Sequence, residues 1–320
     1  MIRTYHKLFE PDYNEVAPEV IIEPAEIMDM DDPQVSRTQL KMQAVALFTS
    51  EWRRRTCWQD MMNIRTRSVP YEREGYEIPC TIYDPREDPA GTLLYFHGGA
   101  WSMNDHEVYD QVLRGIALFG KVRVIAPDYR LAPEYKFPTG LEDCYAALAH
   151  IEREKLAEGK LFIGGDSSGG NFAAAAALMA RDRGRKDITG QVLIYPAVIM
   201  NPELPLKSEQ RYGSGYFLEY RSGQKFTSYY FDDYEEQSDH PYASPLCAGS
   251  LKNLPPALMI MAECDPLLDQ ELMYAARLID EGTDVAYKYY EGMIHAFIHR
   301  PLKETIDAYK AIGDFIQSHA

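Results

Sequence analysis

Gly164-Gly165-Asp166-Ser167-Ser168-Gly169-Gly170-Asn171 is the stretch that decides the fold of this chain. An apolar run, 161–163, leads into it and an alanine-rich run, 172–179, leads out, which predicts a buried strand, a sharp turn and a helix. Glycines two residues before and after Ser167 let such a strand and helix pass closely, so that the serine hydroxyl is held out over the sheet. The amide of Ser168 then lies at a helix N-terminus, where it can donate to an oxyanion.

The Gly-x-Ser-x-Gly pattern of residues 165–169 is a weak signal by itself. Glycine and serine are common, and a glycine-rich turn between a strand and a helix can also cradle a phosphate. The interpretation therefore depends on the rest of the chain.

Length and charge limit the classes of function. The chain has 320 residues, 46% of them hydrophobic, which suits one large α/β domain with additions better than two equal domains. A net charge of −16 argues against nucleic acid and against an anionic membrane surface as partners. No stretch approaches the apolar length of a membrane span.

The cysteines indicate a reducing compartment. Their number is odd, their spacing is wide and no Cys-x-x-Cys occurs, which argues against a disulfide framework and a zinc site: Cys57, Cys80, Cys144, Cys247 and Cys264. The N-terminus carries Lys7, Glu10 and Asp12 without a long apolar run, so it does not read as a secretory signal. We expect a cytoplasmic protein.

Residues 1–64 differ in composition from residues 65–320 and are predicted to form a separate N-terminal region. A helix is expected from Gln39 to Met62, with a break near Ser50. The region either caps a pocket or packs on the flank of the main domain, and helical periodicity does not decide between the two.

From residue 65 onward, apolar strands alternate with helices, after an antiparallel pair at 66–71 and 76–83. This alternation predicts an α/β fold with a mostly parallel sheet of about eight strands and helices on both faces. The expected core strands are 92–96, 122–126, 161–163, 192–195, 257–262 and 285–289. The expected helices are 106–119, 141–154, 172–179, 267–280 and 302–317.

The interval 200–255 interrupts the alternation and is rich in tyrosine and phenylalanine. An insertion of this length is more often a lid or binding element than a loop without a function, so we expect it to contribute to a helical cap. The alternative is that rings such as Tyr229 and Phe231 are ordinary core packing.

The strand 92–96 runs into His97-Gly98-Gly99-Ala100-Trp101. Small residues after a strand let backbone amides turn inward, and with Ser168 they can converge on one developing negative charge. The candidate oxyanion donors are Gly98, Gly99, Ala100 and Ser168. Trp101 and Tyr195, which follow this turn and end a core strand, are candidate substrate contacts.

A serine hydroxyl needs a base to act as a nucleophile at neutral pH. His295 follows the last core strand, so it should lie at the same sheet edge as Ser167. His299 is the second choice, and His240, inside the insertion, is expected at the surface.

The acid that orients such a histidine should follow the preceding strand. Asp265 stands at the end of strand 257–262, and Pro266 sets the turn into the next helix. Asp269 lies one helical turn further, where a capping or packing role is expected.

Taken together, these motifs resemble the hormone-sensitive-lipase group of α/β-hydrolase carboxylesterases, and within it the bacterial acetyl esterases. The matching stretches are 97–99, 128–134 with Phe137-Pro138, 165–171, 265–269 and 295–297. The resemblance covers roughly residues 65–320 and implies an eight-stranded sheet, a cap built from the N-terminal segment and an insertion, and Ser167, Asp265 and His295 as the triad. Ala100 stands where the family usually has a third glycine, and Ser168 where it usually has alanine.

The resemblance implies a serine carboxylesterase that acts on short acyl esters through an acyl-enzyme and needs no cofactor or metal. Its partner would be a small-molecule ester, with a homodimer as a possible assembly. Two rivals stay open: a binding protein of the same fold, against which His295 argues, and a serine peptidase, which usually carries a large extra domain.

Overall fold

The computed structural model describes residues 6–17, 37–38, 41–42, 49–85, 87–200 and 206–320, with the backbone alone for 220–224. The strands are β1 (Arg65–Ser68), β2 (Tyr71–Arg73), β3 (Tyr76–Ile78), β4 (Cys80–Asp84), β5 (Thr92–Phe96), β6 (Arg123–Pro127), β7 (Leu161–Asp166), β8 (Ile188–Ile194), β9 (Ala257–Cys264) and β10 (Val285–Ile294). The helices are α2 (Trp58–Met62), α3 (His106–Phe119), α4 (Thr139–Arg153), α5 (Ser168–Asp182), α6 (Lys207–Tyr212), α7 (Tyr220–Tyr230), α8 (Tyr234–Gln237), α9 (Leu268–Asp280) and α10 (Lys303–Ser318).

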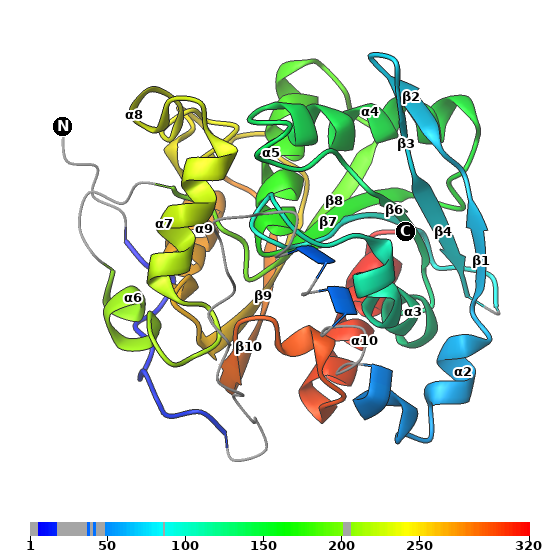
Figure 1. Cartoon of the computed structure of the whole chain (residues 1–320), viewed down its shortest axis with the longest axis horizontal. Helices are drawn as coiled ribbons and strands as arrows, with labels where there is room; N and C mark the ends of the chain where they lie inside the picture. The colour runs from blue at the N-terminus through cyan, green and yellow to red at the C-terminus, as the bar shows by residue number, and fades with distance from the viewer. Residues whose placement is uncertain (1–5, 18–36, 39–40, 43–48, 86, 201–205) are drawn as a thin grey trace.

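An eight-stranded sheet runs through the middle of the molecule in the order β1-β4-β6-β5-β7-β8-β9-β10 (Figure 1). The strands from β6 to β10 along this order pair in parallel, whereas β4 pairs antiparallel with both β1 and β6. This arrangement confirms the predicted mostly parallel sheet with an antiparallel edge.

Alternate residues along the central strands enter different cores. On β5, Leu94 and Phe96 pack in the core that includes α4, α5 and α9, whereas Leu93 and Tyr95 pack in the core that includes α3 and α10. Successive side chains of a strand point to opposite faces, so a strand covered on both sides must be apolar throughout. The predicted helices on both faces of the sheet are therefore confirmed.

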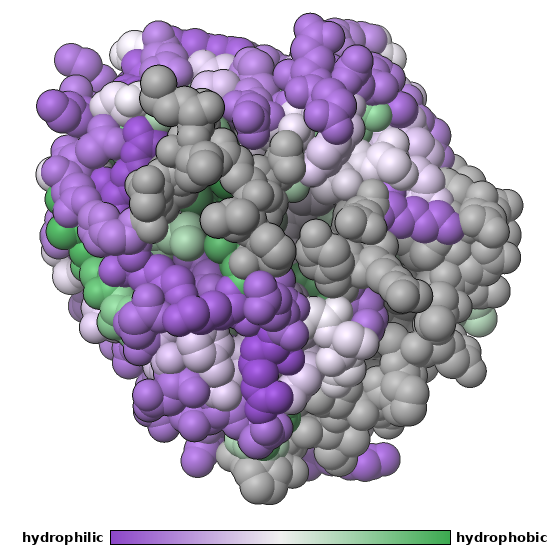
Figure 2. Space-filling model, turned by 90° about the vertical axis from the view of Figure 1, so that its left-hand side faces the viewer, coloured by the Kyte–Doolittle hydropathy of each residue, from purple (hydrophilic) through white to green (hydrophobic). Residues whose placement is uncertain are grey.

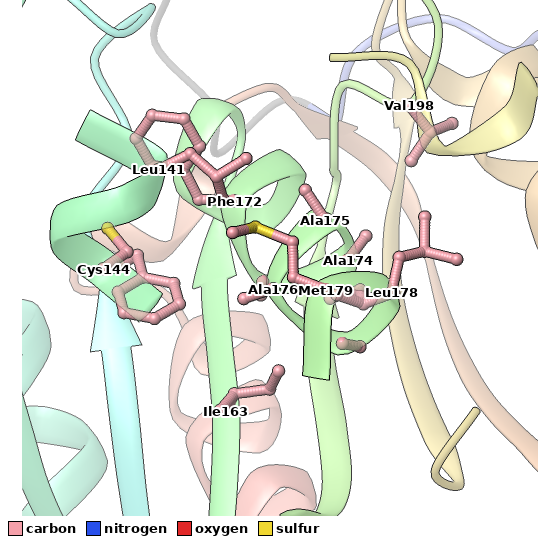
Figure 3. Packing of buried hydrophobic residues seen from close by; sticks show 14 of the residues in the cluster. Leu141, Cys144, Ile163, Phe172, Ala174, Ala175, Ala176, Leu178, Met179 and Val198 are labelled. Atoms are coloured by element: carbon pink, nitrogen blue, oxygen red, sulfur yellow. The ribbon is translucent and has the colours of Figure 1, made fainter. Parts of the chain in front are cut away.

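The helix α5 is built from alanines because it lies close to the sheet. Its buried face packs over Ile163 of β7, and Leu141 and Cys144 of α4 lie beside it (Figure 3). Every residue of α5 from Ser168 to Ala180 is buried. A helix enclosed on all sides needs small residues at its closest contacts and larger ones where space remains.

The predicted antiparallel pair at 66–71 and 76–83 is divided in the structure. β1 pairs with β4 in the main sheet, and β2 pairs with β3 as a separate two-stranded ribbon. Pro70 and Pro79 fall at the two interruptions. Proline has no backbone N–H to donate to a ladder, which explains why each long strand becomes two short ones.

The insertion 200–255 carries α6, α7 and α8 on one side of the molecule, next to α9 (Figure 1). Of the predicted N-terminal helix, the structure describes helical residues 41–42, 49–53 and α2, and the positions 39–40 and 43–48 lie outside the described residues. Ser50 is helical and the interruption lies at 54–57, so the predicted break near Ser50 is displaced. The division at residue 64 and the cap role of these two regions stay predictions.

The packing of α10 on α3 depends on one close backbone approach. A Cβ on Gly313 of α10 would lie 2.7 Å from the Cα and the carbonyl carbon of Gly120, which ends α3. We predict that Gly313→Ala lowers the free energy of unfolding by about 1–3 kcal/mol in urea titrations, because the two helices must move apart. Gly249→Ala is the control, since no atom lies within 4 Å of its added Cβ; equal loss in both variants would contradict the explanation.

Candidate active site

Ser167 lies at the sharp turn between β7 and α5 with φ 55° and ψ −122°. This conformation is strained for a residue with a side chain and persists only where the surroundings enforce it. A Cβ on Gly169 would overlap the carbonyl oxygen of Phe96, and one on Gly165 would meet the backbone of Gly169. The two glycines therefore let the end of β5, the end of β7 and the start of α5 come together beneath the serine.

The structure brings the three predicted side chains together from three different elements. His295 Nε2 lies 2.9 Å from Ser167 Oγ, and His295 Nδ1 lies 2.6 Å from Asp265 Oδ2. Asp265 is fully buried and its second carboxylate oxygen accepts the amide of Leu267 at 2.8 Å. With both carboxylate oxygens engaged, Asp265 can hold the imidazole in the tautomer that presents Nε2 to the serine.

The backbone around His295 is held by a buried carboxylate that the sequence analysis did not single out. Glu263 accepts the amide of Gly292 at 2.8 Å and the amide of Asn14 at 3.2 Å. Gly292 has φ +67°, and its carbonyl accepts the amide of Ala17 at 3.0 Å. The N-terminal segment 6–17 is thus bonded to the two strands that carry Asp265 and His295.

The predicted oxyanion donor Gly98 does not fit the geometry. Its amide donates to the Tyr109 hydroxyl at 2.9 Å and to Asp166 Oδ1 at 3.1 Å, so it points away from Ser167. The corrected set of candidate donors is Gly99, Ala100 and Ser168. No hydrogen bond from the amides of Gly99 and Ala100 is found within the described part of the chain, and Ser168, the first residue of α5, has no intrahelical acceptor.

Asp166 anchors this loop, and no motif rule drew attention to it. Its buried carboxylate accepts the hydroxyls of Tyr95 at 2.7 Å and Tyr109 at 2.9 Å, besides the Gly98 amide. Asn104 holds the other end, because its side-chain amide donates to the Gly98 carbonyl at 3.1 Å. In the sequence, only the position of Asp166 directly before Ser167, at the end of a buried strand, could have indicated this role.

The two candidate substrate contacts differ in position. Trp101 is buried, stacks on Tyr230 with ring centroids 4.8 Å apart and donates from its indole to Asn171 at 3.2 Å. Tyr195 has no exposed surface, and its ring packs against that of His295 at 4.6 Å. The prediction of Tyr195 as a substrate contact is therefore corrected: it supports the imidazole from within the core.

The remaining alternatives have structural roles. His299 is buried with its ring edge-on to Tyr109, and burial lowers its pKa to about 4. His240 is exposed, as expected. Asp269 is buried and binds the Lys7 ammonium at 2.9 Å and the amide of Ser208 at 3.1 Å, so it joins the N-terminal segment to α6.

The first turn of α9 also carries a buried acid, Glu271, that has no charged partner among the residues described. Burial raises the pKa of Glu271 well above its usual range, and the nearby Asp265 and Asp269 carboxylates raise it further. A protonated Glu271 avoids a third negative charge in this turn. Among the residues that the structure describes, no group of three or more His, Cys, Asp or Glu side chains is placed to hold a metal ion.

Comparisons with known proteins agree on one fold and one kind of chemistry. A family model described as alpha/beta hydrolase fold matches residues 93–299. The chain is 38% identical over 246 residues to an arylesterase of Saccharolobus solfataricus, covering 74% of this chain and 78% of that protein. It is 34% identical over 258 residues to an ethyl acetate hydrolase of Pseudomonas putida, covering 77% of this chain and 80% of that protein.

Solved structures give the same result. A hyperthermophilic esterase from the archaeon Pyrobaculum calidifontis superposes with a TM-score of 0.82 at 34% identity, covering 92% of this chain and 94% of that one. The thermophilic carboxylesterase EstE1, cloned from a metagenomic library, superposes with a TM-score of 0.81 at 32% identity, covering 90% and 97%.

The buried His299 predicts a pH dependence of stability. Its pKa is about 4 in the folded protein and about 6.5 in the unfolded chain, so the unfolded state binds the proton more tightly. The contribution of the neutral His299 to the free energy of unfolding is then fully present above pH 6.5 and is lost as the pH falls toward 4. We predict that His299→Phe reduces the loss of unfolding free energy between pH 7 and pH 4.5 by about 2–3 kcal/mol in urea titrations. An unchanged loss would show that His299 is not buried in its neutral form.

Proposed function

The chain belongs to the alpha/beta hydrolase family, in its hormone-sensitive-lipase-like group of esterases, and from this premise we propose that it is a serine carboxylesterase in which Ser167, His295 and Asp265 carry the reaction. The single observation that supports these roles most is the unbroken series of contacts from Asp265 through His295 to Ser167, at 2.6 Å and 2.9 Å.

In the proposed mechanism His295 Nε2 takes the proton of Ser167 as the oxygen attacks the ester carbonyl. The imidazolium, stabilised by Asp265, returns that proton to the leaving alcohol as the tetrahedral intermediate collapses to an acyl-enzyme. A water molecule, deprotonated by the same imidazole, then attacks the acyl carbon and releases the carboxylic acid and free Ser167.

The amides of Gly99, Ala100 and Ser168 are proposed to donate to the oxygen that becomes negative in each tetrahedral intermediate. Support comes from the left-handed backbone after the first core strand, where Gly99 has φ 128° and Ala100 has φ 50°. Loss of one such donor costs about 3–4 kcal/mol of transition-state stabilisation in comparable sites. Because Asp166 holds Gly98 directly before these amides, it acts as a positioning residue.

The acyl group is proposed to be short. Trp101 is bonded to Asn171, one turn of α5 beyond Ser167, and its indole is stacked at an interplanar angle of 11° on Tyr230 at the end of α7. Phe137 packs edge-on against the same tyrosine with ring centroids 5.6 Å apart. Trp101, Tyr230 and Phe137 thus form an aromatic wall in which Tyr230 is packed on two sides. Figure 2, which views the face that carries α6, α7 and α8, shows a few hydrophobic residues within a mostly hydrophilic surface.

The location and the assembly are proposals too. All five cysteines are free thiols, which supports a reducing compartment such as the cytoplasm. No helix in the described ranges is long and apolar enough to cross a membrane.

β10 ends the sheet and exposes 49% of Tyr287, which supports a homodimer that pairs along this edge. Light scattering in solution would distinguish a dimer from a monomer.

The assignment of the nucleophile and the base predicts a pattern of losses. Ser167→Ala and His295→Ala should each reduce kcat/KM for p-nitrophenyl acetate by several orders of magnitude, and Asp265→Asn somewhat less. His299→Ala should retain most of the activity, since its ring packs on Tyr109 and not on Ser167. The assignment fails if His299→Ala inactivates the enzyme while His295→Ala does not, provided that both proteins unfold at temperatures close to that of the wild type.

The aromatic wall predicts the preference for acyl length. An open slot would gain about 0.8 kcal/mol for each buried methylene, whereas forcing a chain against a fixed wall costs about 1–3 kcal/mol. We predict that kcat/KM across p-nitrophenyl esters from C2 to C12 is highest between acetyl and butyryl and low from octanoyl onward. A maximum at C8 or beyond would mean that the rings line an acyl channel.

A further inference from the structure

A groove of about 550 Å³ lies between the helical residues 49–53, α2, the edge strand β1 with its neighbour β4, and the first turns of α3. In Figure 1 these elements lie on the right-hand side, away from α6, α7 and α8. The residues that matter for its chemistry are Arg53, Trp58, Arg67, His106 and Gln111. None of the triad or candidate oxyanion residues lines it.

The acidic side chains of the groove are already neutralised. Glu107 pairs with the Lys41 ammonium at 2.7 Å, and Asp110 pairs with the Arg114 guanidinium at 2.8 Å. His106 is bonded through Nδ1 to Asp128, and that hydrogen bond raises the pKa of the imidazole. The acids therefore leave no uncompensated negative charge for a ligand to meet.

Two guanidinium groups in the groove have no carboxylate partner among the described residues. Across the ranges that the structure describes, neither Arg53 nor Arg67 has an ion pair, although the chain as a whole carries a net charge of −16. Arg53 lies over the ring of Trp58 at 5.9 Å, which orients its guanidinium. Arginine forks match the planar or tetrahedral oxygens of carboxylates and phosphates, so the free charges point to an oxyanion.

A buried acceptor in the wall of the groove, the Gln111 side-chain oxygen, also lacks a donor within the described ranges. Gln111 is 4% exposed, and its side-chain amide donates to the Thr49 hydroxyl at 2.7 Å. Its Oε1 has no hydrogen-bond partner in the described part of the chain. Buried polar atoms are nearly always hydrogen-bonded, so an unpaired oxygen beside a groove calls for a donor supplied from outside the chain. Oε1 is closed off from solvent in this structure, so a ligand hydroxyl reaches it when the Gln111 side chain turns toward the groove.

We propose that this groove is a second binding site, separate from the esterase centre, for a small hydroxylated oxyanion: a phosphate or carboxylate on a polyhydroxyl carbon skeleton. Arg53 and Arg67 bind the charged group, and Gln111 accepts a hydrogen bond from a hydroxyl. A groove of this volume is within the range of small-molecule sites in proteins.

Calorimetric titration at constant ionic strength tests the proposal, with glucose 6-phosphate as the probe and inorganic phosphate and glucose as comparisons. We expect saturable one-to-one binding of glucose 6-phosphate, weaker binding of phosphate and none of glucose. Arg53→Gln with Arg67→Gln should weaken binding of glucose 6-phosphate by about tenfold or more, since two charge-assisted contacts are lost.

The matched control is Arg54→Gln with Arg65→Gln. These arginines are exposed neighbours on the same two segments, neither has an ion pair within the described residues, and neither lines the groove. The control pair removes the same net charge and should change the dissociation constant by less than about twofold, because screened surface charges act weakly at a distance. Equal weakening in both pairs, or no saturable binding by the wild type, would overturn the site.

Gln111→Leu tests the hydroxyl contact. It should weaken binding of glucose 6-phosphate and leave that of inorganic phosphate unchanged, whereas equal effects on both ligands would overturn the role of Gln111. The two double variants and Gln111→Leu should unfold at the temperature of the wild type and turn over p-nitrophenyl acetate at its rate. These two measurements separate loss of binding from loss of fold.

Discussion

The close approach of three backbones beneath Ser167 is the constraint on which the rest of the site depends. β5 and β7 are adjacent parallel strands, and α5 begins directly at the end of β7. Beneath the serine, a Cβ on Gly165 or on Gly169 would overlap the backbone of a neighbour. This close packing holds Ser167, a residue with a side chain, at φ 55°. The same contact puts the loop after β5 beside the first turn of α5.

Buried carboxylates hold the loops around this turn, and each does so with more than one hydrogen bond. Asp166 accepts hydrogen bonds from two tyrosine hydroxyls and from the Gly98 amide. Glu263 accepts hydrogen bonds from the amides of Gly292 and Asn14. A buried charge is tolerable only when several donors replace its hydration. This requirement makes the two acids good anchors, because movement of either loop would leave a charge unsatisfied.

The charged groups around the groove differ in whether they have an ion-pair partner, and net charge alone does not describe them. Most of the charged groups near α3 are in ion pairs, including Lys41 with Asp105 and Arg114 with Asp110. Two guanidinium groups that have no ion pair among the described residues, Arg53 and Arg67, line the same groove as Gln111, whose amide oxygen has no donor there. The esterase centre is built on buried contacts between strand ends, whereas the groove lies at the antiparallel edge of the sheet.

The sequence by itself determined the fold class, the order of the strands and helices and the identity of the Ser, His and Asp that meet at one sheet edge. These follow from local rules: apolar runs mark buried strands, glycine spacing marks the sharp turn, and chain order sets which loops follow which strands. Only the tertiary structure decided that Gly98 points away from Ser167 and that Tyr195 lies behind His295. It alone also identified Asp166 and Glu263 as anchors. The physical reason is that a hydrogen bond or a ring contact between residues far apart in the chain depends on side-chain direction, which no local pattern of residue types encodes.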